Sequence, residues 1–163
     1  DHVVAATDFV GSVDWEEGEL ASCSVSIRFP VTALAVDPGA SRGWAGLDGE
    51  TSDGDKKSIT KNMLGRHQLE GDVFPEVAFT SSKCEPTTGG AVVHGTLAIH
   101  GVGAPVAAKM RIEADGERLR ARGTFEMAHG AWGLVPFSAL LGSLRNADPL
   151  TFVIDVVGRT PGT

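Results

Sequence analysis

Apolar residues recur at every second position through much of the segment from Ala91 to Met127, with polar or charged residues between them. A period of two, with one apolar and one polar face, is typical of half-buried antiparallel strands. Two turn signals, His100-Gly101-Val102-Gly103 before Pro105 and Asp115-Gly116, divide this segment into three strands. The chain therefore contains a meander whose apolar face must be covered, either by further strands that curl round it or by a second layer.

Length and composition favour an all-β domain and narrow the classes of partner. With 163 residues, of which 42% are hydrophobic, the chain suits one domain with a sizeable core. Twenty-one glycines and eight prolines, without a long helical pattern, favour a body rich in turns. The net charge of −7 argues against binding to nucleic acid or to an anionic membrane surface. A solvated outer strand face explains the basic stripe of Arg118, Arg120 and Arg122 better than a phosphate site does.

The remaining elements follow from the same kind of pattern. Further strands are expected at residues 3–15, 23–34, 77–83 and 150–157, the first of them broken near Gly11. A helix is predicted over residues 58–69, with Ser58 or Thr60 as its cap. A short helical turn is predicted from Pro136 to Leu141, because proline is favoured at the first helical position. Residues 37–57, rich in Gly, Asp and Ser, are expected to form a long exposed loop.

Three motifs, in order along the chain, resemble those of the YceI-like family. The first spans residues 62–79 and has a leucine, an acidic linker and an aromatic-Pro-x-aliphatic-x-Phe strand start at Leu69, Asp72, Phe74, Pro75, Val77 and Phe79. The second, from Gly95 to Val106, resembles the family's turn Gly-x-Leu-x-Ile-x-Gly-Val-x-x-Pro-Val. The third resembles the C-terminal portion of one branch and consists of Trp132-Gly133-Leu134, Pro136 to Gly142 and Leu144.

The resemblance implies a lipocalin-like antiparallel β-barrel of about eight strands, with one inserted helix and a short C-terminal helical turn. Its interior would hold one long apolar amphiphile, typically a polyisoprenoid such as a quinone tail or an isoprenoid precursor, without a required cofactor. The setting would be periplasmic or secreted. Residues 1–163 would form a single YceI-like domain that lacks the family's first strand, which lies before the position of Asp1 and His2. The Arg-Asp pair often found on the family's helix is replaced around Gly65-Arg66-His67, so no role for that pair carries over.

The inward faces of the expected strands carry no charge. A tunnel lined in this way would attract a hydrocarbon chain through burial alone, at about 25 cal/mol per Å² of apolar surface removed from water. The residues expected to line it are Phe29, Phe79, Leu97, Met110, Phe125, Trp132, Phe137, Leu141 and Phe152. A solid core would use the same residues. The small inward positions Gly95, Ala108, Ala121 and Gly123 leave space that either a ligand or larger neighbours could fill.

Enzyme and metal signatures are absent from the sequence. It contains no Gly-x-Ser-x-Gly, no Gly-rich phosphate loop and no His-Glu-x-x-His. The five histidines are scattered, and Ser138 has no base beside it in sequence. The acidic residues Asp48, Asp53 and Asp55 fail the calcium-loop template, which needs a glycine and a glutamate at fixed offsets. The sequence therefore predicts a binding protein, with neither catalytic nor metal-ligating residues.

The two cysteines are expected to form a disulfide. Cys23 begins one strand and Cys84 ends another, so the two lie side by side if those strands are antiparallel neighbours. Such a bridge closes a long loop and stabilises by roughly 4 kcal/mol in the chain-entropy model. Strict alternation places the cysteines on opposite faces, so a bulge or a register shift near one of them is required. A disulfide indicates an oxidising compartment.

A barrel that lacks one strand has an exposed edge, and exposed edges recruit partners. The strand near Val3 is expected either to pair with residues absent from this chain or to be covered by another subunit, which leaves both a protein partner and a homodimer open. This edge supports a second class of function, an accessory subunit of a membrane or electron-transfer assembly with vestigial ligand binding. Its candidate contacts are Trp15, Trp44 and the 37–57 loop.

Overall fold

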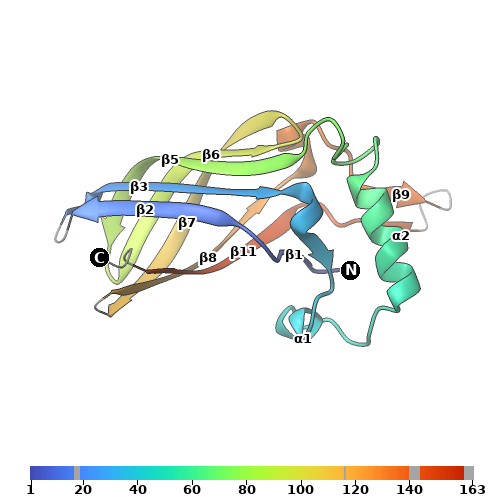
Figure 1. The fold of residues 1–163 in the computed structure, drawn as a ribbon, viewed down its shortest axis with the longest axis horizontal. Coiled ribbons are helices and arrows are strands. Elements are labelled where there is room, and N and C mark those ends of the chain that lie inside the picture. Colours follow the sequence, from blue (N-terminus) through green and yellow to red (C-terminus); the bar gives the residue numbers. More distant parts are fainter. Residues whose placement is uncertain (17–18, 116, 140–143, 160–163) are drawn as a thin grey trace.

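The computed structural model describes residues 1–16, 19–115, 117–139 and 144–159, and most of these lie in antiparallel strands. Seven strands form one sheet in the order β11-β8-β7-β6-β5-β3-β2 (Figure 1). Their bounds are β2 Val10–Glu16, β3 Glu19–Pro30, β5 Glu76–Thr87, β6 Gly90–Ile99, β7 Val102–Asp115, β8 Arg118–Met127 and β11 Leu150–Arg159. Every pair of neighbours in this order is antiparallel.

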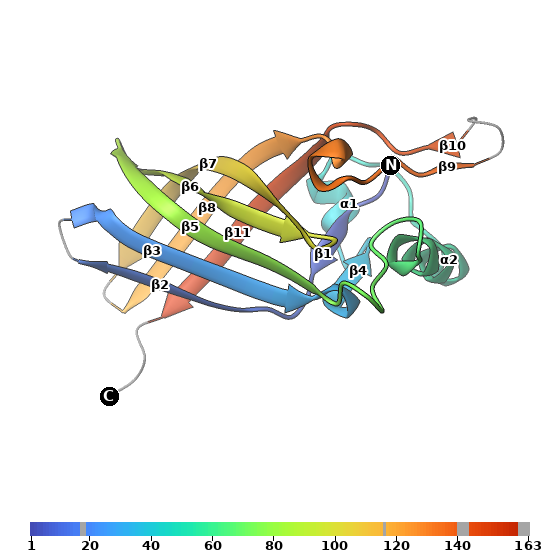
Figure 2. The ribbon, with the colours of Figure 1, turned by 90° about the horizontal axis from the view of Figure 1, so that it is seen from above.

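The sheet curls into a half-barrel (Figures 1 and 2). Strands β2 and β11 are its two edges, and no ladder joins them among the described residues. The prediction of an all-β, antiparallel, lipocalin-like architecture with an inserted helix is therefore confirmed. The curled sheet has seven strands, and it stays open along the line between its two edge strands.

The central meander has the predicted alternation and a tight first turn. Ile99 of β6 pairs with Val102 of β7, and the two residues between them, His100 and Gly101, have φ values of 53° and 71°. Two consecutive residues with positive φ are typical of a type I′ hairpin turn. The ring of Phe74 lies 4.5 Å from that of His100, and a Cβ atom on Gly101 would come within 2.6 Å of Phe74. Both the turn and the contact with Phe74 therefore favour glycine at this position.

The second turn of the meander is only partly described. Asp115, the last residue of β7, pairs with Arg118, the first residue of β8. This pairing agrees with the tight turn that Asp115-Gly116 predicts, although Gly116 itself lies outside the described residues. On the far side of β6, Thr87 pairs with Gly90, so another short turn joins β5 to β6.

The elements outside the large sheet gather at one end of it, which we call the cap (Figure 2). They are β1 Val4–Ala6, η1 Val31–Ala33, β4 Leu34–Val36, α1 Ser41–Trp44, α2 Asp53–Leu64, η2 His129–Trp132, β9 Ser138–Ala139 and β10 Leu144–Arg145. Two small antiparallel pairs, β1 with β4 and β9 with β10, belong to this group. None of the described helices is both long enough and apolar enough to cross a membrane.

The inserted helix begins earlier than predicted. α2 spans Asp53–Leu64 instead of 58–69, and its N-cap is Ser52 rather than Ser58 or Thr60. The Ser52 hydroxyl accepts a hydrogen bond of 3.1 Å from the amide of Asp55 and donates one of 2.7 Å to the Asp55 carboxylate. This reciprocal arrangement is a capping box, and acidic residues in the first turn also favour the helix dipole. The prediction was wrong because apolar spacing around Ile59 outweighed the capping signal.

Three other expectations need correction. The 37–57 segment contains α1 and the first turns of α2, so it is not an uninterrupted loop. The helical turn predicted over 136–141 lies earlier, as η2 at His129–Trp132, while residues 136–137 are not helical and 138–139 form β9. Residues 140–141 lie outside the described residues. The N-terminal break falls at residues 7–9, and Gly11 lies within β2 opposite Ile27.

Candidate ligand-binding site

Alternate residues of the seven strands face the concave side of the half-barrel, which we call the trough. None of these inward residues is charged. They include Val13 and Trp15 of β2, Val25, Ile27 and Phe29 of β3, Val77 and Phe79 of β5, the alternate residues from Ala91 to Ile99 and from Ala104 to Ile112, Leu119 to Met127 of β8, and Leu150 to Val156 of β11. The trough is therefore lined almost entirely by aliphatic and aromatic groups.

Solvent exposure changes in steps across the trough. The inward residues of β6 and those of β7 as far as Met110 are buried, with at most 9% of their surface exposed. Those of β3, β8 and β11 are mostly half-buried. On the edge strand β2, Val13 and Trp15 are 36% and 41% exposed. The centre of the sheet thus forms a dry floor, and its walls become wetter toward the two edges.

Aromatic side chains close the trough at the cap end. Trp132 of η2 is fully buried, and its indole N–H donates a hydrogen bond of 2.8 Å to the carbonyl of Leu97. The Trp132 ring lies 5.6 Å from that of Phe152, which stacks in parallel on Phe125 at 4.7 Å. Val31, Val77, Ile99, Ala104 and Val106 complete the buried part of this cap-end cluster.

A second cluster fills the other end of the floor, around the disulfide. Its buried members are Cys84, Ala91, Val93, Ala108 and Met110. Half-buried side chains from both walls pack on it, and Phe79 and Phe125 also contact the cap-end cluster. The apolar interior is therefore continuous along the length of the trough.

The glycines of the floor are covered by larger neighbours. A Cβ atom on Gly95 would lie 2.6 Å from the ring of Phe79, and one on Gly123 would lie 2.5 Å from the sulfur of Met110. The space left by Gly95 and Gly123 is thus taken by side chains of the same sheet. Of the two readings that the sequence left open at these two positions, packing by neighbours is the correct one. Any ligand must lie above this floor, between the half-buried walls.

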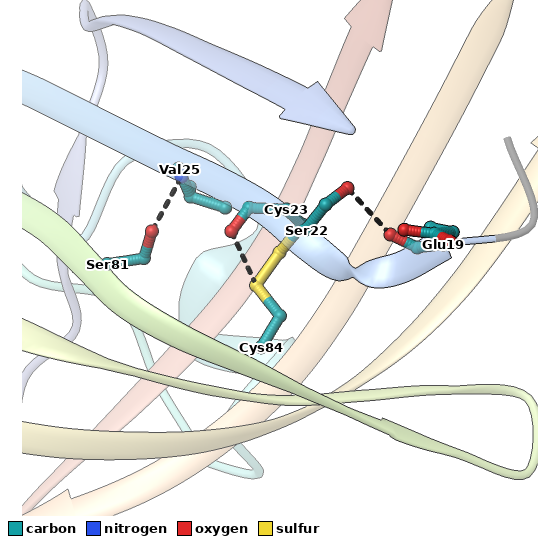
Figure 3. Close-up of a disulfide and its surroundings, with 6 residues drawn as sticks. All are labelled: Glu19, Ser22, Cys23, Val25, Ser81 and Cys84. Atoms are coloured by element: carbon teal, nitrogen blue, oxygen red, sulfur yellow. Dashed lines mark hydrogen bonds between the residues drawn. A yellow bond between two sulfur atoms is a disulfide. The ribbon is translucent and has the colours of Figure 1, made fainter. Parts of the chain in front are cut away.

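The predicted disulfide is present and joins Cys23 of β3 to Cys84 of β5 (Figure 3). Their Cα atoms are 5.8 Å apart. The pairing of β5 with β6 shifts register between Ser81 and Lys83, which turns Cys84 to the same face as Cys23. The bulge that strict alternation required is therefore found beside Cys84.

Most of the predicted lining residues lie in the trough. Leu97, Met110 and Trp132 belong to the buried floor and the cap-end closure, whereas Phe29, Phe79, Phe125 and Phe152 are half-buried and contribute to the walls. Phe137 lies just before β9, outside the large sheet, and belongs to neither cluster among the described residues. Leu141 lies outside the described residues. The prediction omitted the half-exposed wall residues Val13, Trp15 and Ile154, although the alternation within β2 and β11 marks their inward faces.

The cap is held together by a buried carboxylate. Asp37 follows β4, and its side chain accepts hydrogen bonds from the Thr51 hydroxyl at 2.6 Å and from the Val3 amide at 2.8 Å. His2 and Arg42 lie 2.7 and 3.3 Å from the same carboxylate. Burial by itself raises the pKa of Asp37, but the hydrogen bonds from Thr51, His2 and Val3 outweigh it and hold this pKa well below its usual range. The ionised Asp37 thus ties the N-terminal segment to α1 and to the segment before α2.

The histidines lie apart, each near its own partners. His94 is 3.2 Å from Glu85, and His129 is 3.1 Å from Asp148 and also donates its backbone N–H to that carboxylate. These hydrogen bonds from His129 lower the pKa of Asp148. Within the described part of the chain, no three His, Cys, Asp or Glu side chains come together as metal ligands would.

The arginine stripe lies on the outer face of β8. Arg120 makes two hydrogen bonds to Asp155 of β11, at 2.8 and 2.6 Å, and these lower the pKa of Asp155. Arg122 lies 3.6 Å from the same carboxylate. The stripe is thus part of a solvated ion-pair network, which has the character expected of an outer strand face.

A groove of about 430 Å³ runs over β2, β3 and β5. It is lined by Val10, Gly11, Ser12, Ser26, Ile27, Arg28, Ala78, Phe79 and Thr80. The alternation that turns Ile27 and Phe79 into the trough turns Ser26, Arg28 and Thr80 to the opposite face. Since most of the lining residues have that outward parity, we do not count this groove as part of the trough.

Comparison with known proteins agrees with this architecture. The model of the YceI-like domain matches residues 2–156. BcnA of Burkholderia cenocepacia has a similar structure, with a TM-score of 0.75, 18% sequence identity and coverage of 95% of this chain and 86% of that one. The YCEI protein of Campylobacter jejuni has a TM-score of 0.72, 12% identity and coverage of 98% and 85%. No curated protein matches the sequence significantly. Because the family match covers nearly the whole chain, the chain belongs to the YceI-like family.

Proposed function

We propose that the chain binds a long apolar amphiphile, such as a polyisoprenoid or a quinone-like lipid, along its trough and carries or stores it. The observation that carries this proposal is the half-buried state of an uncharged inner surface. Aromatic wall residues, such as Phe125 and Phe152, keep part of their surface exposed although they face inward. An apolar chain laid against them would remove that surface from water, at about 25 cal/mol per Å².

The trough offers no charged group to a polar ligand. Ser81 is its one hydroxyl on β5, and its oxygen already accepts a hydrogen bond of 2.7 Å from the Val25 amide. The polar headgroup of a bound amphiphile would therefore remain at the wet rim, while its hydrocarbon chain follows the walls. Membership of the YceI-like family, which is known for binding polyisoprenoids, supports the same class of ligand.

We further propose that the protein acts by binding, without catalysis, in a periplasmic or secreted setting. The Cys23–Cys84 disulfide supports an oxidising compartment, because such bonds are rare where thiols are kept reduced. The described histidines and carboxylates are paired for structure, and none lies on the inner face of the large sheet.

A second candidate function is that of an accessory subunit, in which a partner covers the β2 edge. The observation that favours it is the exposure of Phe9, Val10, Val13 and Trp15 along that edge. Trp44 of α1, which is 86% exposed, lies in the cap rather than on this edge. Free strand edges with apolar side chains are common sites of protein pairing.

Extraction of the purified native protein with organic solvent, followed by mass spectrometry of the extract, separates the two functions. A stoichiometric isoprenoid or quinone lipid supports the binding function. An extract without lipid, together with failure of the protein to take up an added isoprenoid alcohol, contradicts it and favours the subunit.

A further inference from the structure

The outer half of the β2–β3 hairpin is joined to the rest of the sheet by few interactions. The ladder between β3 and β5 runs from Pro30, opposite Glu76, to Ser26, opposite Thr80. Among the described residues it stops there, although β3 begins at Glu19 and its pairing with β2 continues beyond Ser26. We call residues 12–16 and 19–25 the distal hairpin.

Two contacts replace the missing ladder. The amide of Val25 donates a hydrogen bond of 2.7 Å to the side-chain oxygen of Ser81, and the disulfide links Cys23 to Cys84 (Figure 3). Half-buried Leu20 and Val25 add apolar contacts with the cluster around the disulfide. The register shift after Ser81 interrupts the regular edge of β5, so this edge cannot offer the distal hairpin a continuous row of backbone partners.

The distal hairpin forms one wall of the trough. It carries the inward side chains Val13, Trp15 and Val25, and its outer strand, β2, is one of the two unpaired edges of the sheet. Because β2 and β11 border the open side of the half-barrel, the position of the distal hairpin sets the width of that opening at the disulfide end. The disulfide is the one covalent restraint on this position.

We infer that Cys23–Cys84 is a site of thiol–disulfide exchange, and that its reduction by a dithiol releases the distal hairpin and opens the trough. The part of this inference that concerns a bound amphiphile rests on the proposed function. The reductant is a dithiol, either a small molecule or a pair of cysteines on a protein. Cys84 is 1% exposed, whereas Cys23 is half-buried, so the sulfur of Cys23 is the one that a thiolate reaches from solvent.

The exchange proceeds in two balanced steps. A thiolate of the dithiol attacks the sulfur of Cys23, forms a mixed disulfide with it and expels the thiolate of Cys84. The second thiolate of the reductant then attacks its own sulfur in the mixed disulfide and expels the thiolate of Cys23. The two cysteine thiolates take up the two protons that the dithiol lost. The protein disulfide is thus reduced to two thiols, and the dithiol is oxidised to a disulfide.

Reduction leaves the hydrogen bond from Val25 to Ser81 and the apolar contacts of Leu20 and Val25 as the attachments of the distal hairpin to the sheet. A unit with so few attachments opens locally while the continuous ladders of β5 to β8 stay intact. The oxidised protein therefore retains a bound chain, and the reduced protein releases it.

Hydrogen–deuterium exchange tests the release of the hairpin directly. The protein is compared before and after treatment with dithiothreitol, with mass spectrometry of alkylated thiols as the check on reduction. Exchange in residues 19–25 should become at least about tenfold faster, while residues 91–99 and 104–112 keep their rates. The double variant Cys23→Ser/Cys84→Ser should show the fast rates without reductant and no further change with it. Resistance to dithiothreitol, unchanged rates after complete reduction, or faster exchange throughout the sheet would each overturn the inference.

A release assay with Nile red, a neutral apolar dye, separates this inference from the proposed function. The dye should leave the reduced protein at least roughly tenfold faster than the oxidised protein. Binding with equal release rates in both states would overturn the control of access and leave the proposed function standing. Failure to bind in either state would contradict the proposed function, while the exchange rates still decide whether the disulfide holds the hairpin.

Discussion

The indole N–H of Trp132 donates a hydrogen bond of 2.8 Å to the backbone carbonyl of Leu97, and both groups lie in the buried core. This bond connects η2, which follows the last strand of the meander, to the middle of β6. It fixes the indole ring against Phe152 and thereby closes the trough at the cap end. Trp132 is therefore part of the architecture that any ligand meets, and its contribution can be measured as stability.

Replacing Trp132 by Phe keeps much of the apolar volume but removes the donor to Leu97. The free energy of unfolding should fall by about 1–3 kcal/mol, because a buried hydrogen-bond partner is lost. Trp132→Ala should cost about 3–5 kcal/mol, since it also leaves a cavity. Urea denaturation followed by circular dichroism measures both. Equal stability of Trp132→Phe and the wild type would show that the bond contributes nothing.

Asp37→Asn should destabilise the cap in a pH-dependent way. The folded state lowers the pKa of Asp37, so this carboxylate contributes stability above its unfolded pKa, about 4, and loses it as the pH falls toward the folded value. Near neutral pH the variant should be less stable by roughly 2–4 kcal/mol. The gap should narrow at about pH 3 because only the wild type loses this contribution. Denaturation at both pH values is the measurement, and a gap independent of pH would contradict the assignment.

A pair of adjacent substitutions on β11 separates the inner face from the outer one. Ile154 is half-buried and faces the trough, whereas Val153 is 75% exposed on the opposite face. Ile154→Asn should weaken binding of an isoprenoid alcohol by about tenfold or more, because it places an amide against the hydrocarbon chain. Val153→Asn should leave the affinity unchanged. Equal losses in both variants, measured by fluorescence titration, would mean that the ligand does not lie in the trough.

The packing of the floor gives another prediction. A methyl group at Gly95 would meet the carbonyl oxygen of Thr80 at 2.4 Å and the Phe79 ring at 2.6 Å, whereas one at Gly158 meets no atom within 4 Å. Gly95→Ala should therefore reduce the free energy of unfolding by about 1–3 kcal/mol through overpacking. Gly158→Ala should change it by less than about 0.5 kcal/mol. Similar unfolding midpoints for the two variants in urea would contradict the tight contact between Gly95 and Phe79.

The sequence predicts the parts of this fold that a local period determines. The alternation from Ala91 to Met127 correctly predicts the meander and its inward residues, because a half-buried strand must place its apolar side chains on one face. The bulge near Cys84 also follows from the sequence, since the two cysteines can meet only if one strand shifts its register. The capping box of Ser52 and Asp55 was a readable signal that apolar spacing obscured.

Other features depend on contacts between distant segments. Whether Gly95 leaves a hollow depends on where the Phe79 ring lies, and Phe79 reaches it from the neighbouring strand. The burial of Asp37 requires Thr51 and His2 to converge on it, which no local pattern indicates. The short pairing of β3 with β5, which leaves the disulfide to hold the distal hairpin, likewise follows from the curl of the whole sheet.

Photolabelling tests the central claim, that a long apolar amphiphile binds along the trough. The protein is incubated with an isoprenoid alcohol that carries a diazirine on its chain, irradiated, digested and sequenced by mass spectrometry. Label on inward residues of the walls, such as Trp15, Phe125 and Ile154, is the predicted result. Label on outward residues such as Val153, or no label above that of a denatured control, would contradict the claim.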